Sequence, residues 1–130
     1  MKRLIKSLFN KFGIDLVRFP NVNCDAYRRS LIVKSLEIDL IIDVGANAGF
    51  FAKEMFKLGF EGQIVSYEPL NEPFKIMQGL SQKSTKWKAY NYALGSENTI
   101  SSINIAGNSF SSSILDMLPQ HLKSSPDSIL

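Results

Sequence analysis

Apolar and polar positions along this chain fall into blocks that switch between a strand-like and a helical spacing. The central block is LIIDVGANAGFF at residues 40–51, where a continuous apolar run ends at a Gly-Ala-Asn-Ala-Gly turn and helical spacing follows. A short apolar run bounded by glycines and followed by a 3.6-residue period is typical of a buried parallel strand that leads into a helix. This block therefore predicts a strand over 40–44, a turn over 45–49 and a helix over 50–58.

The same alternation recurs farther along the chain. Apolar runs at 64–67 and 87–94 predict two more strands, and a helix over about 71–80 is expected between them, since Pro73 is acceptable in a first helical turn. Strands that alternate with helices predict a parallel sheet with right-handed crossovers. The expected fold class is therefore α/β, a doubly wound, Rossmann-like sheet that binds ligands at the carboxyl ends of its strands.

Two helices are predicted before the first strand. Asp25 is expected to cap a helix over 26–36, whose inward-facing side chains would be Tyr27, Leu31, Ile32 and Leu36. Near the start of the chain, one helical face gathers Leu4, Ile5, Leu8, Phe9 and Phe12, with Lys2, Arg3, Lys6 and Lys11 around it. Such a basic amphipathic helix is able to pack on its own domain or to make peripheral contact with an anionic membrane, and both interpretations stay open.

The composition is that of an ordinary globular protein of one domain. Of its 130 residues 45% are hydrophobic and 21% charged, with a net charge of +3. Residues 1–40 carry eight Lys/Arg against four Asp/Glu, so the basic excess belongs to the amino-terminal arm and does not imply nucleic acid. The lone cysteine, Cys24, excludes an internal disulfide and suits the reducing cytoplasm. No apolar run reaches the roughly 18 residues of a membrane span.

The turn at 45–49 has the features of a cofactor cradle. Gly45 is able to adopt a positive φ or to let a ligand approach the backbone, and the N–H groups of the following helix start are expected to face the space above the strand. Glu68 stands at the tip of the second strand, 23 residues after Gly45, where a carboxylate is able to bind the ribose hydroxyls of a nucleotide. The alternative is a strand-end acid that caps the next helix. Pro69 stiffens the loop in either case.

The charge beside this turn distinguishes between nucleotides. The turn reads G-x-x-x-G, with Asn47 where the dinucleotide fingerprint has its middle glycine, and Asp43 stands two residues before Gly45. A carboxylate there repels a pyrophosphate and attracts a ligand that carries an ammonium and a sulfonium group. The sequence therefore favours S-adenosylmethionine over NAD as the cofactor.

Several stretches together resemble the FkbM family of S-adenosylmethionine-dependent methyltransferases. They are IDLIIDVGANAGFFA, VSYEPLNEPF, YALG and NSFSSSIL, and the upstream GIDLVRFP and DAYRRSL are also similar to bacterial members. The resemblance implies the class I methyltransferase fold and O-methylation of a hydroxyl on a sugar or secondary metabolite, with a small-molecule or glycan acceptor. It also implies a cofactor site made of Asp43, Gly45, Ala46, Asn47, Gly49, Glu68 and Pro69, with Ala93 and Leu94 near the adenine.

One feature of the family has no counterpart in this sequence. A fourth strand with a K-I-D-V-E-G-type motif stands beside the transfer site in the family, and nothing like it occurs before Leu130. That strand pairs with the first in the class I order, so its absence predicts an open apolar edge along 40–44 and self-association through that edge. Residues 1–37 are expected to form a helical arm. Residues 38–130 are expected to form the amino-terminal half of a methyltransferase domain, a fragment that is inactive alone.

Two other classes of protein remain alternatives. One is an NAD-dependent oxidoreductase, and the other is a non-catalytic remnant that binds neither cofactor. The single histidine, His121, excludes a catalytic triad and a histidine metal pair, so no metal is expected, and a surface helix is its expected place. No residue is assigned as the catalytic base.

Overall fold

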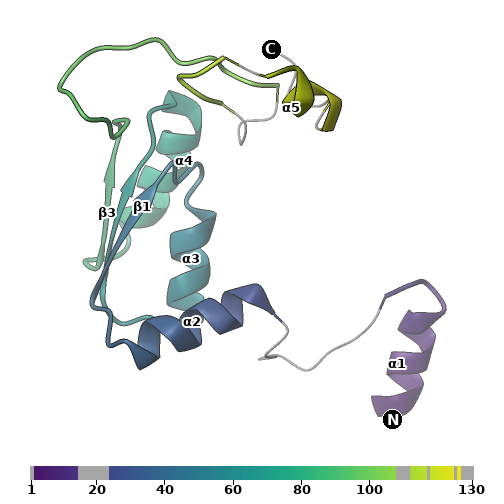
Figure 1. The fold of residues 1–130 in the computed structure, drawn as a ribbon. Coiled ribbons are helices and arrows are strands. Elements are labelled where there is room, and N and C mark those ends of the chain that lie inside the picture. The colour runs from purple at the N-terminus through teal and green to yellow at the C-terminus, as the bar shows by residue number, and fades with distance from the viewer. Residues whose placement is uncertain (1, 15–23, 108–111, 117, 125, 127–130) are drawn as a thin grey trace.

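A computed structural model describes residues 2–14, 24–107, 112–116, 118–124 and 126 of the chain (Figure 1). Helices and strands alternate through its central part, as the sequence predicts. The elements in chain order are α1 (Lys2–Asn10), α2 (Asp25–Ser35), β1 (Leu40–Val44), α3 (Phe50–Lys57), β2 (Gln63–Tyr67), α4 (Asn71–Ser81), β3 (Trp87–Tyr90) and α5 (Pro119–Ser124). The protein therefore contains an α/β unit with additional helices near both ends of the chain.

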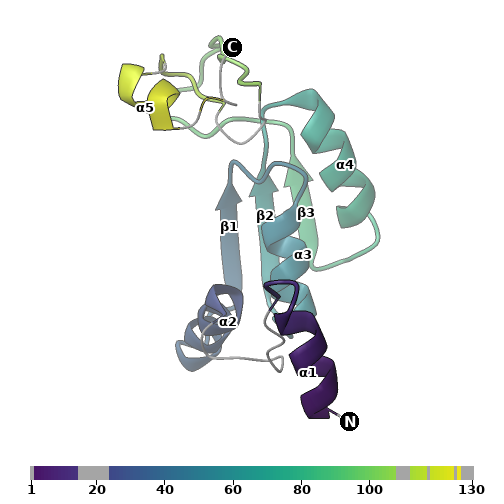
Figure 2. The same cartoon turned by 90° about the vertical axis from the view of Figure 1, so that its right-hand side faces the viewer.

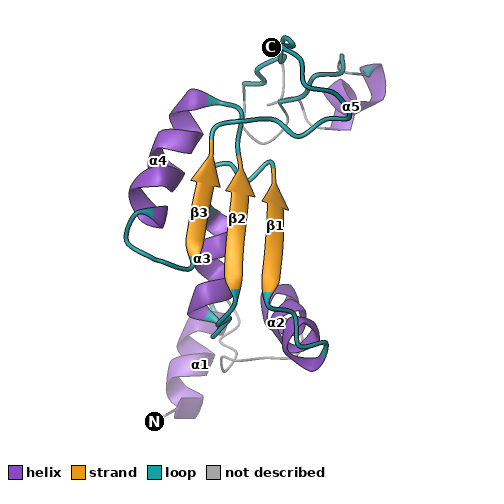
Figure 3. Ribbon diagram, turned by 90° about the vertical axis from the view of Figure 1, so that its left-hand side faces the viewer, coloured by secondary structure: helices purple, strands orange, loops and turns teal. Residues whose placement is uncertain are grey.

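The three strands form a parallel sheet in the order β1-β2-β3, with all carboxyl ends at one edge (Figure 3). The register places Ile41 beside Ile64 and Ile64 beside Trp87, and it places Asp43 beside Ser66. Because successive side chains of a strand point to opposite faces, these five residues share one face of the sheet. That face carries both the core and the polar residues of the candidate site.

The helices α3 and α4 both cover this one face, as the edge-on view of Figure 1 shows. Two right-handed crossovers that advance in the same direction along a sheet place their helices on the same side. The opposite face is uncovered among the described residues, and both Ile42 and Val44 of β1 are 59% exposed there. The parallel α/β sheet is thus confirmed. A doubly wound sheet has helices on both faces, and the described elements supply them on one.

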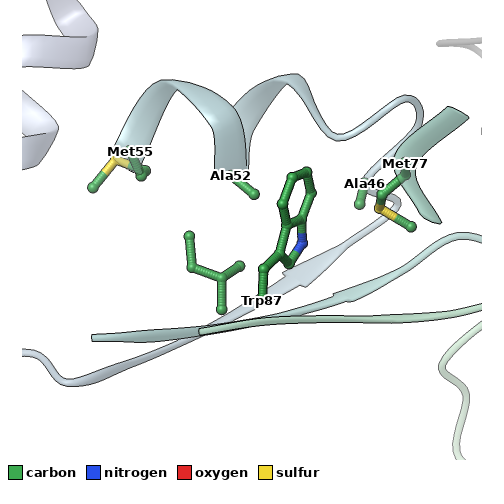
Figure 4. Packing of buried hydrophobic residues seen from close by; sticks show 6 residues of the cluster. Ala46, Ala52, Met55, Met77 and Trp87 are labelled. Atoms are coloured by element: carbon green, nitrogen blue, oxygen red, sulfur yellow. The ribbon is translucent and has the colours of Figure 1, made fainter. Parts of the chain in front are cut away.

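The core lies between the sheet and these two helices. It consists of the buried residues Ala46, Ala52, Met55, Ile64, Met77 and Trp87. Figure 4 shows Trp87 standing on the sheet beneath α3, with Ala52 and Met55 directed toward the strands from the helix. Because members of this cluster come from the turn after β1, from both helices and from the strands, their packing holds the turn at 45–49 in place.

The strand and helix boundaries follow the predicted ones closely, with one exception. β1 spans 40–44 as predicted, and Gly59, with φ +88°, follows the end of α3. β3 ends at Tyr90, four residues earlier than the predicted strand over 87–94. The reason is local, because the side chain of Asn91 turns back and donates to the backbone carbonyls of Glu68 and Pro69 at 2.8 and 3.1 Å.

The predicted cap of α2 is wrong. The helix begins at Asp25, the N-cap position is Cys24, and no side chain caps this end. Asp25 instead pairs with Arg28 one turn along the helix, and this pair lowers the pKa of the Asp25 carboxyl. Asp25 therefore acts as an acidic residue of the first helical turn.

The predicted inward face of α2 is also wrong for its large aliphatic residues. Leu31, Ile32 and Leu36 are exposed, whereas Ala26 is buried and Val33 packs against the core. Arg29 of α2 contacts two residues of α3. Its guanidinium lies 2.8 Å from a carboxylate oxygen of Glu54 and is positioned over the ring of Phe51. The helix thus approaches its neighbour through Arg29 and Val33.

Candidate functional site

The turn between β1 and α3 reverses the chain at the carboxyl edge of the sheet (Figure 2). Three of its five residues have a positive φ, which is +74° at Gly45, +49° at Asn47 and +79° at Gly49. Glycine adopts this conformation without steric cost, and asparagine is one of the few other residues that tolerates it. The G-x-x-x-G spacing of the sequence therefore matches the backbone that this turn requires.

Every backbone N–H group of the turn donates a hydrogen bond within the protein. The N–H groups of Gly45 and Ala46 both donate to the carbonyl oxygen of Tyr67, at 2.9 and 3.0 Å. The N–H of Asn47 donates to Glu68 Oε2 at 2.8 Å, and the N–H of Ala48 donates to Asn47 Oδ1 at 2.7 Å. The N–H of Gly49 donates to the carbonyl oxygen of Ala46 at 2.9 Å. The sequence-based expectation of free N–H groups concerns the start of the following helix, α3, which begins at Phe50, and the hydrogen bonds of residues 45–49 do not test it. Their donors hold the turn in shape and are not directed at a ligand.

Glu68 joins this turn to the tip of β2. Its side chain is buried, with 4% of its surface exposed, and Oε2 accepts the Asn47 N–H while Oε1 accepts the Leu70 N–H, both at 2.8 Å. Leu70 is the N-cap residue of α4, so Glu68 contacts the residue before the helix. No side-chain cap hydrogen bond forms at this helix end, and the interpretation of Glu68 as a helix cap stays open. The ribose contact stays a prediction. Each carboxylate oxygen still has a second lone pair for a hydroxyl group.

Asp43 lies on the same face of the sheet as Glu68 and is partly buried. Its Oδ2 accepts a hydrogen bond from the Ser66 hydroxyl at 3.2 Å, and the same hydroxyl oxygen accepts the indole N–H of Trp87 at 3.0 Å. Burial raises the pKa of the Asp43 carboxyl, the Ser66 hydrogen bond opposes that rise, and the negative charge of Glu68 adds to it. The negative charge of Glu68 thus acts on Asp43 beside the turn.

Two of the predicted site residues, Ala46 and Gly49, belong to the core. Ala46 is buried, and a Cβ added at Gly49 would lie 2.7 Å from two ring atoms of Trp87. A Cβ added at Gly45 would meet nothing within 4 Å. Gly49 therefore permits close packing of α3 on the sheet, whereas the backbone of Gly45 borders open space that a ligand is able to enter.

The remaining predicted residues lie along the carboxyl edge. Pro69 is partly buried, and its carbonyl accepts from Asn91. Ala93 and Leu94 follow β3 and are exposed, and within the described residues no hydrogen bond connects them to the turn. Their contact with an adenine stays a prediction.

The serine-rich stretch NSFSSSIL, residues 108–115, lies only partly within the described residues. Ser109 and Ser111 are outside them, the hydroxyl of Ser112 accepts the Ala106 N–H at 3.2 Å, and Ser113 forms an antiparallel bridge with Asn104. The segment that contains this bridge and α5 lies beyond the carboxyl ends of the strands in both face-on views (Figures 2 and 3). Its polar groups are therefore at the same end of the molecule as the turn.

Sequence reasoning missed two residues that order this site, Ser66 and Asn91. Ser66 is the residue of β2 in register with Asp43, so a correct strand register would have found it. Asn91 follows β3 and holds the backbone on which Glu68 stands. Its signal in the sequence is weak, because an asparagine at a strand end is common in ordinary turns.

A hollow of about 730 Å³ lies at the other end of the sheet, between α2 and the loops at 37–39 and 58–62. None of the predicted site residues lines it. The described residues also contain no group of three His, Cys, Asp or Glu side chains placed to hold a metal ion. The predicted site residues lie at the carboxyl end of the sheet, away from this hollow.

Comparison with known proteins does not identify this site. The chain matches no protein-family model, no curated protein and no solved structure. The resemblance of its motifs to the FkbM family therefore remains an expectation from the sequence. A function has to follow from the geometry and the charge of the turn.

Proposed function

We propose that this chain binds S-adenosylmethionine at the carboxyl end of β1, as the cofactor-binding part of a methyltransferase that acts on a hydroxyl group of a sugar or secondary metabolite. The observation that carries this proposal is the turn at 45–49, whose N–H groups are all used internally and which is flanked by Asp43 and Glu68. The acceptor class comes from the motif resemblance alone.

The N–H groups of the turn argue against a dinucleotide cofactor. A pyrophosphate cradle depends on backbone N–H groups that point at the phosphate oxygens. The five N–H groups from Gly45 to Gly49 already have acceptors, and a pyrophosphate would also lie close to two carboxylates. Both features oppose NAD, which supports the choice between cofactors made from the sequence.

The carboxylates favour a cationic ligand. Burial makes the charged form of Asp43 costly, and a positive group nearby would stabilise it. S-adenosylmethionine carries an ammonium and a sulfonium group and no phosphate. The chemistry that it supplies when bound is an activated methyl group.

Each residue around the turn would have a separate role in binding this ligand. Gly45 would let the ligand lie against the backbone, since no atom of the protein occupies the space that a Cβ would take there. Asp43 would balance positive charge. Glu68 orders the turn through Asn47 and would accept a ribose hydroxyl with a remaining lone pair. No residue is assigned as the catalytic base.

Equilibrium dialysis with labelled S-adenosylmethionine tests the proposal. Saturable binding that unlabelled S-adenosylhomocysteine displaces and NADH does not displace is the expected result. Displacement by NADH, or an absence of saturable binding to a protein with a cooperative melt, would overturn it.

A further inference from the structure

The helix α1 presents an apolar face that no described residue covers. Leu4 and Phe12 are each 76% exposed, and Leu8 between them is 56% exposed. With Ile5 and Phe9 they occupy one continuous arc of the helix and the turn after it, at 100° per residue. The expectation that this face packs on its own domain therefore finds no support in the described structure.

The polar side of the same helix carries only positive charge. Residues 2–12 contain Lys2, Arg3, Lys6 and Lys11 and no acidic residue. Helical spacing continued into the turn after α1 places Lys11 at one border of the apolar arc. Long side chains in this position are able to extend their ammonium groups toward a charged surface while the apolar arc is buried.

We propose that α1 docks on an anionic lipid surface, with Leu4, Leu8 and Phe12 in the boundary between headgroups and acyl chains and the lysines on the lipid phosphates. Charge complementarity selects this occupant. An interfacial helix combines a cationic polar face with leucine and phenylalanine on the other face, and its affinity adds apolar burial to attraction by anionic lipids. The proposal does not depend on the identity of the cofactor.

Two other occupants fit the helix less well. If α1 faced a second copy of the chain, the two copies of residues 2–12 would bring eight positive charges together without one acidic residue to pair them. A nucleic acid would pair with the lysines but would offer no apolar phase to Leu4, Leu8 and Phe12. None of the described helices has the length and apolar composition needed to cross a bilayer, so the docking is on the surface.

The test is co-sedimentation of the full chain with vesicles. One set contains only phosphatidylcholine, and the other contains equal parts of phosphatidylcholine and phosphatidylglycerol. We expect binding to the anionic vesicles that weakens as salt is added, with little binding to the neutral ones. Leu8→Asp should reduce this binding on the order of tenfold or more, because it places a charge in the centre of the apolar arc. Lys6→Glu should also reduce it on the order of tenfold.

Ile100→Asp is the matched control, since Ile100 is a fully exposed apolar residue outside α1. It should bind vesicles like the wild type. All variants should keep the wild-type melt, because none of these side chains is buried. Equal loss of binding in Leu8→Asp and Ile100→Asp, or no preference for anionic vesicles, would overturn the proposal. A lipid-free wild type that sediments as a dimer and becomes monomeric in Leu8→Asp would assign the face to a second copy.

Discussion

The backbone N–H of Asn47 donates a hydrogen bond of 2.8 Å to the carboxylate of Glu68, which connects the turn after β1 to the tip of β2. Asn47 has φ +49°, a conformation that a non-glycine residue adopts at some cost and that this bond helps to hold. Glu68 is buried, and the bond itself is partly buried. The carboxylate expected to hold a ribose therefore also shapes the turn against which the cofactor would lie.

Glu68→Gln should lower both stability and cofactor affinity. The amide keeps one acceptor oxygen, but its NH₂ group faces an N–H group where the second carboxylate oxygen accepted one. We expect the free energy of unfolding to fall by about 1–3 kcal/mol, the range for hydrogen bonds to charged groups and for buried donors left without acceptors. S-adenosylhomocysteine should bind more weakly by a similar amount. Urea denaturation and titration calorimetry measure the two effects.

Glu72→Gln provides the comparison for that variant. Glu72 is an exposed acid in the first turn of α4 and pairs with Lys75 at 2.9 Å. Its replacement should change the free energy of unfolding by about 0.5 kcal/mol or less. If Glu68→Gln proved as mild as Glu72→Gln in the denaturation experiment, Glu68 would not be holding the turn.

Gly45→Val should remove binding from a protein that still folds. A Cβ at this position meets no heavy atom within 4 Å, so we expect a conformational cost to folding of about 1–2 kcal/mol for a left-handed backbone. The side chain would, however, fill the space through which a ligand approaches the backbone. Calorimetry with S-adenosylhomocysteine and a thermal melt test this together. Normal affinity would mean that Gly45 serves only the shape of the turn.

Gly49→Ala should destabilise the hydrophobic core. This result would show that the second glycine of the turn serves packing, unlike Gly45. The added Cβ would lie 2.7 Å from the Trp87 ring, so the helix or the indole has to move. Overpacking of this kind costs about 1–3 kcal/mol, in addition to the strain of a positive φ. Trp87 is the only tryptophan, so its fluorescence should change in the folded state. An unchanged spectrum and melt would contradict the close packing.

Asp43→Asn should raise stability at neutral pH. Burial raises the pKa of the Asp43 carboxyl, so the folded chain binds this proton more tightly than the unfolded chain does. Its contribution to stability is therefore most favourable below the ordinary pKa of about 3.9 and declines as pH rises through the folded value. Asparagine carries no charge, so the melting temperature of the Asp43→Asn variant should exceed that of the wild type at pH 7. The difference between the two melting temperatures should shrink as pH falls toward 4. A variant less stable than the wild type at pH 7 would contradict this.

Among the described residues no strand pairs with the outer edge of β1, and we expect the chain to associate through this edge. Asp39 and Gly45 bond to β2, so by alternation the N–H and C=O groups of residues 40, 42 and 44 point to the free edge. Exposed edges of this kind pair with other strands, and lysine is a residue that natural edges use to prevent it. We expect sizing chromatography to show concentration-dependent association that Ile42→Lys suppresses. Identical elution of Ile42→Lys and the wild type at all concentrations would exclude the β1 edge as the contact.

The strands and turns were predictable because their signals are local. The apolar run at 40–44 and the glycines at 45 and 59 set the ends of β1 and α3 through backbone conformation alone. The acid at the tip of β2 was also placed correctly, since a strand end is readable from the sequence. What Glu68 contacts was not readable in the same way. Its partner Asn47 lies 21 residues away, and the bond exists because two strands end side by side.

The inward side of α2 was mispredicted for a related reason. Leu31 and Ile32 have the larger apolar side chains, but the salt bridge between Arg29 and Glu54 helps set the side of the helix that approaches α3. With this side of α2 toward α3, Val33 packs against the core. Helical periodicity identifies which residues share a face, and the tertiary contact decides which face is buried.

Titration calorimetry on the wild type and Asp43→Asn tests the central claim most directly. S-adenosylmethionine, S-adenosylhomocysteine and NADH are titrated into each protein at neutral pH. We predict that the wild type binds S-adenosylmethionine and S-adenosylhomocysteine but not NADH. Asp43→Asn should lower the affinity for S-adenosylmethionine more than the affinity for S-adenosylhomocysteine, because only S-adenosylmethionine carries the sulfonium charge. Binding of NADH by the wild type, or an equal effect of Asp43→Asn on both adenosyl ligands, would contradict a turn built for a cationic cofactor.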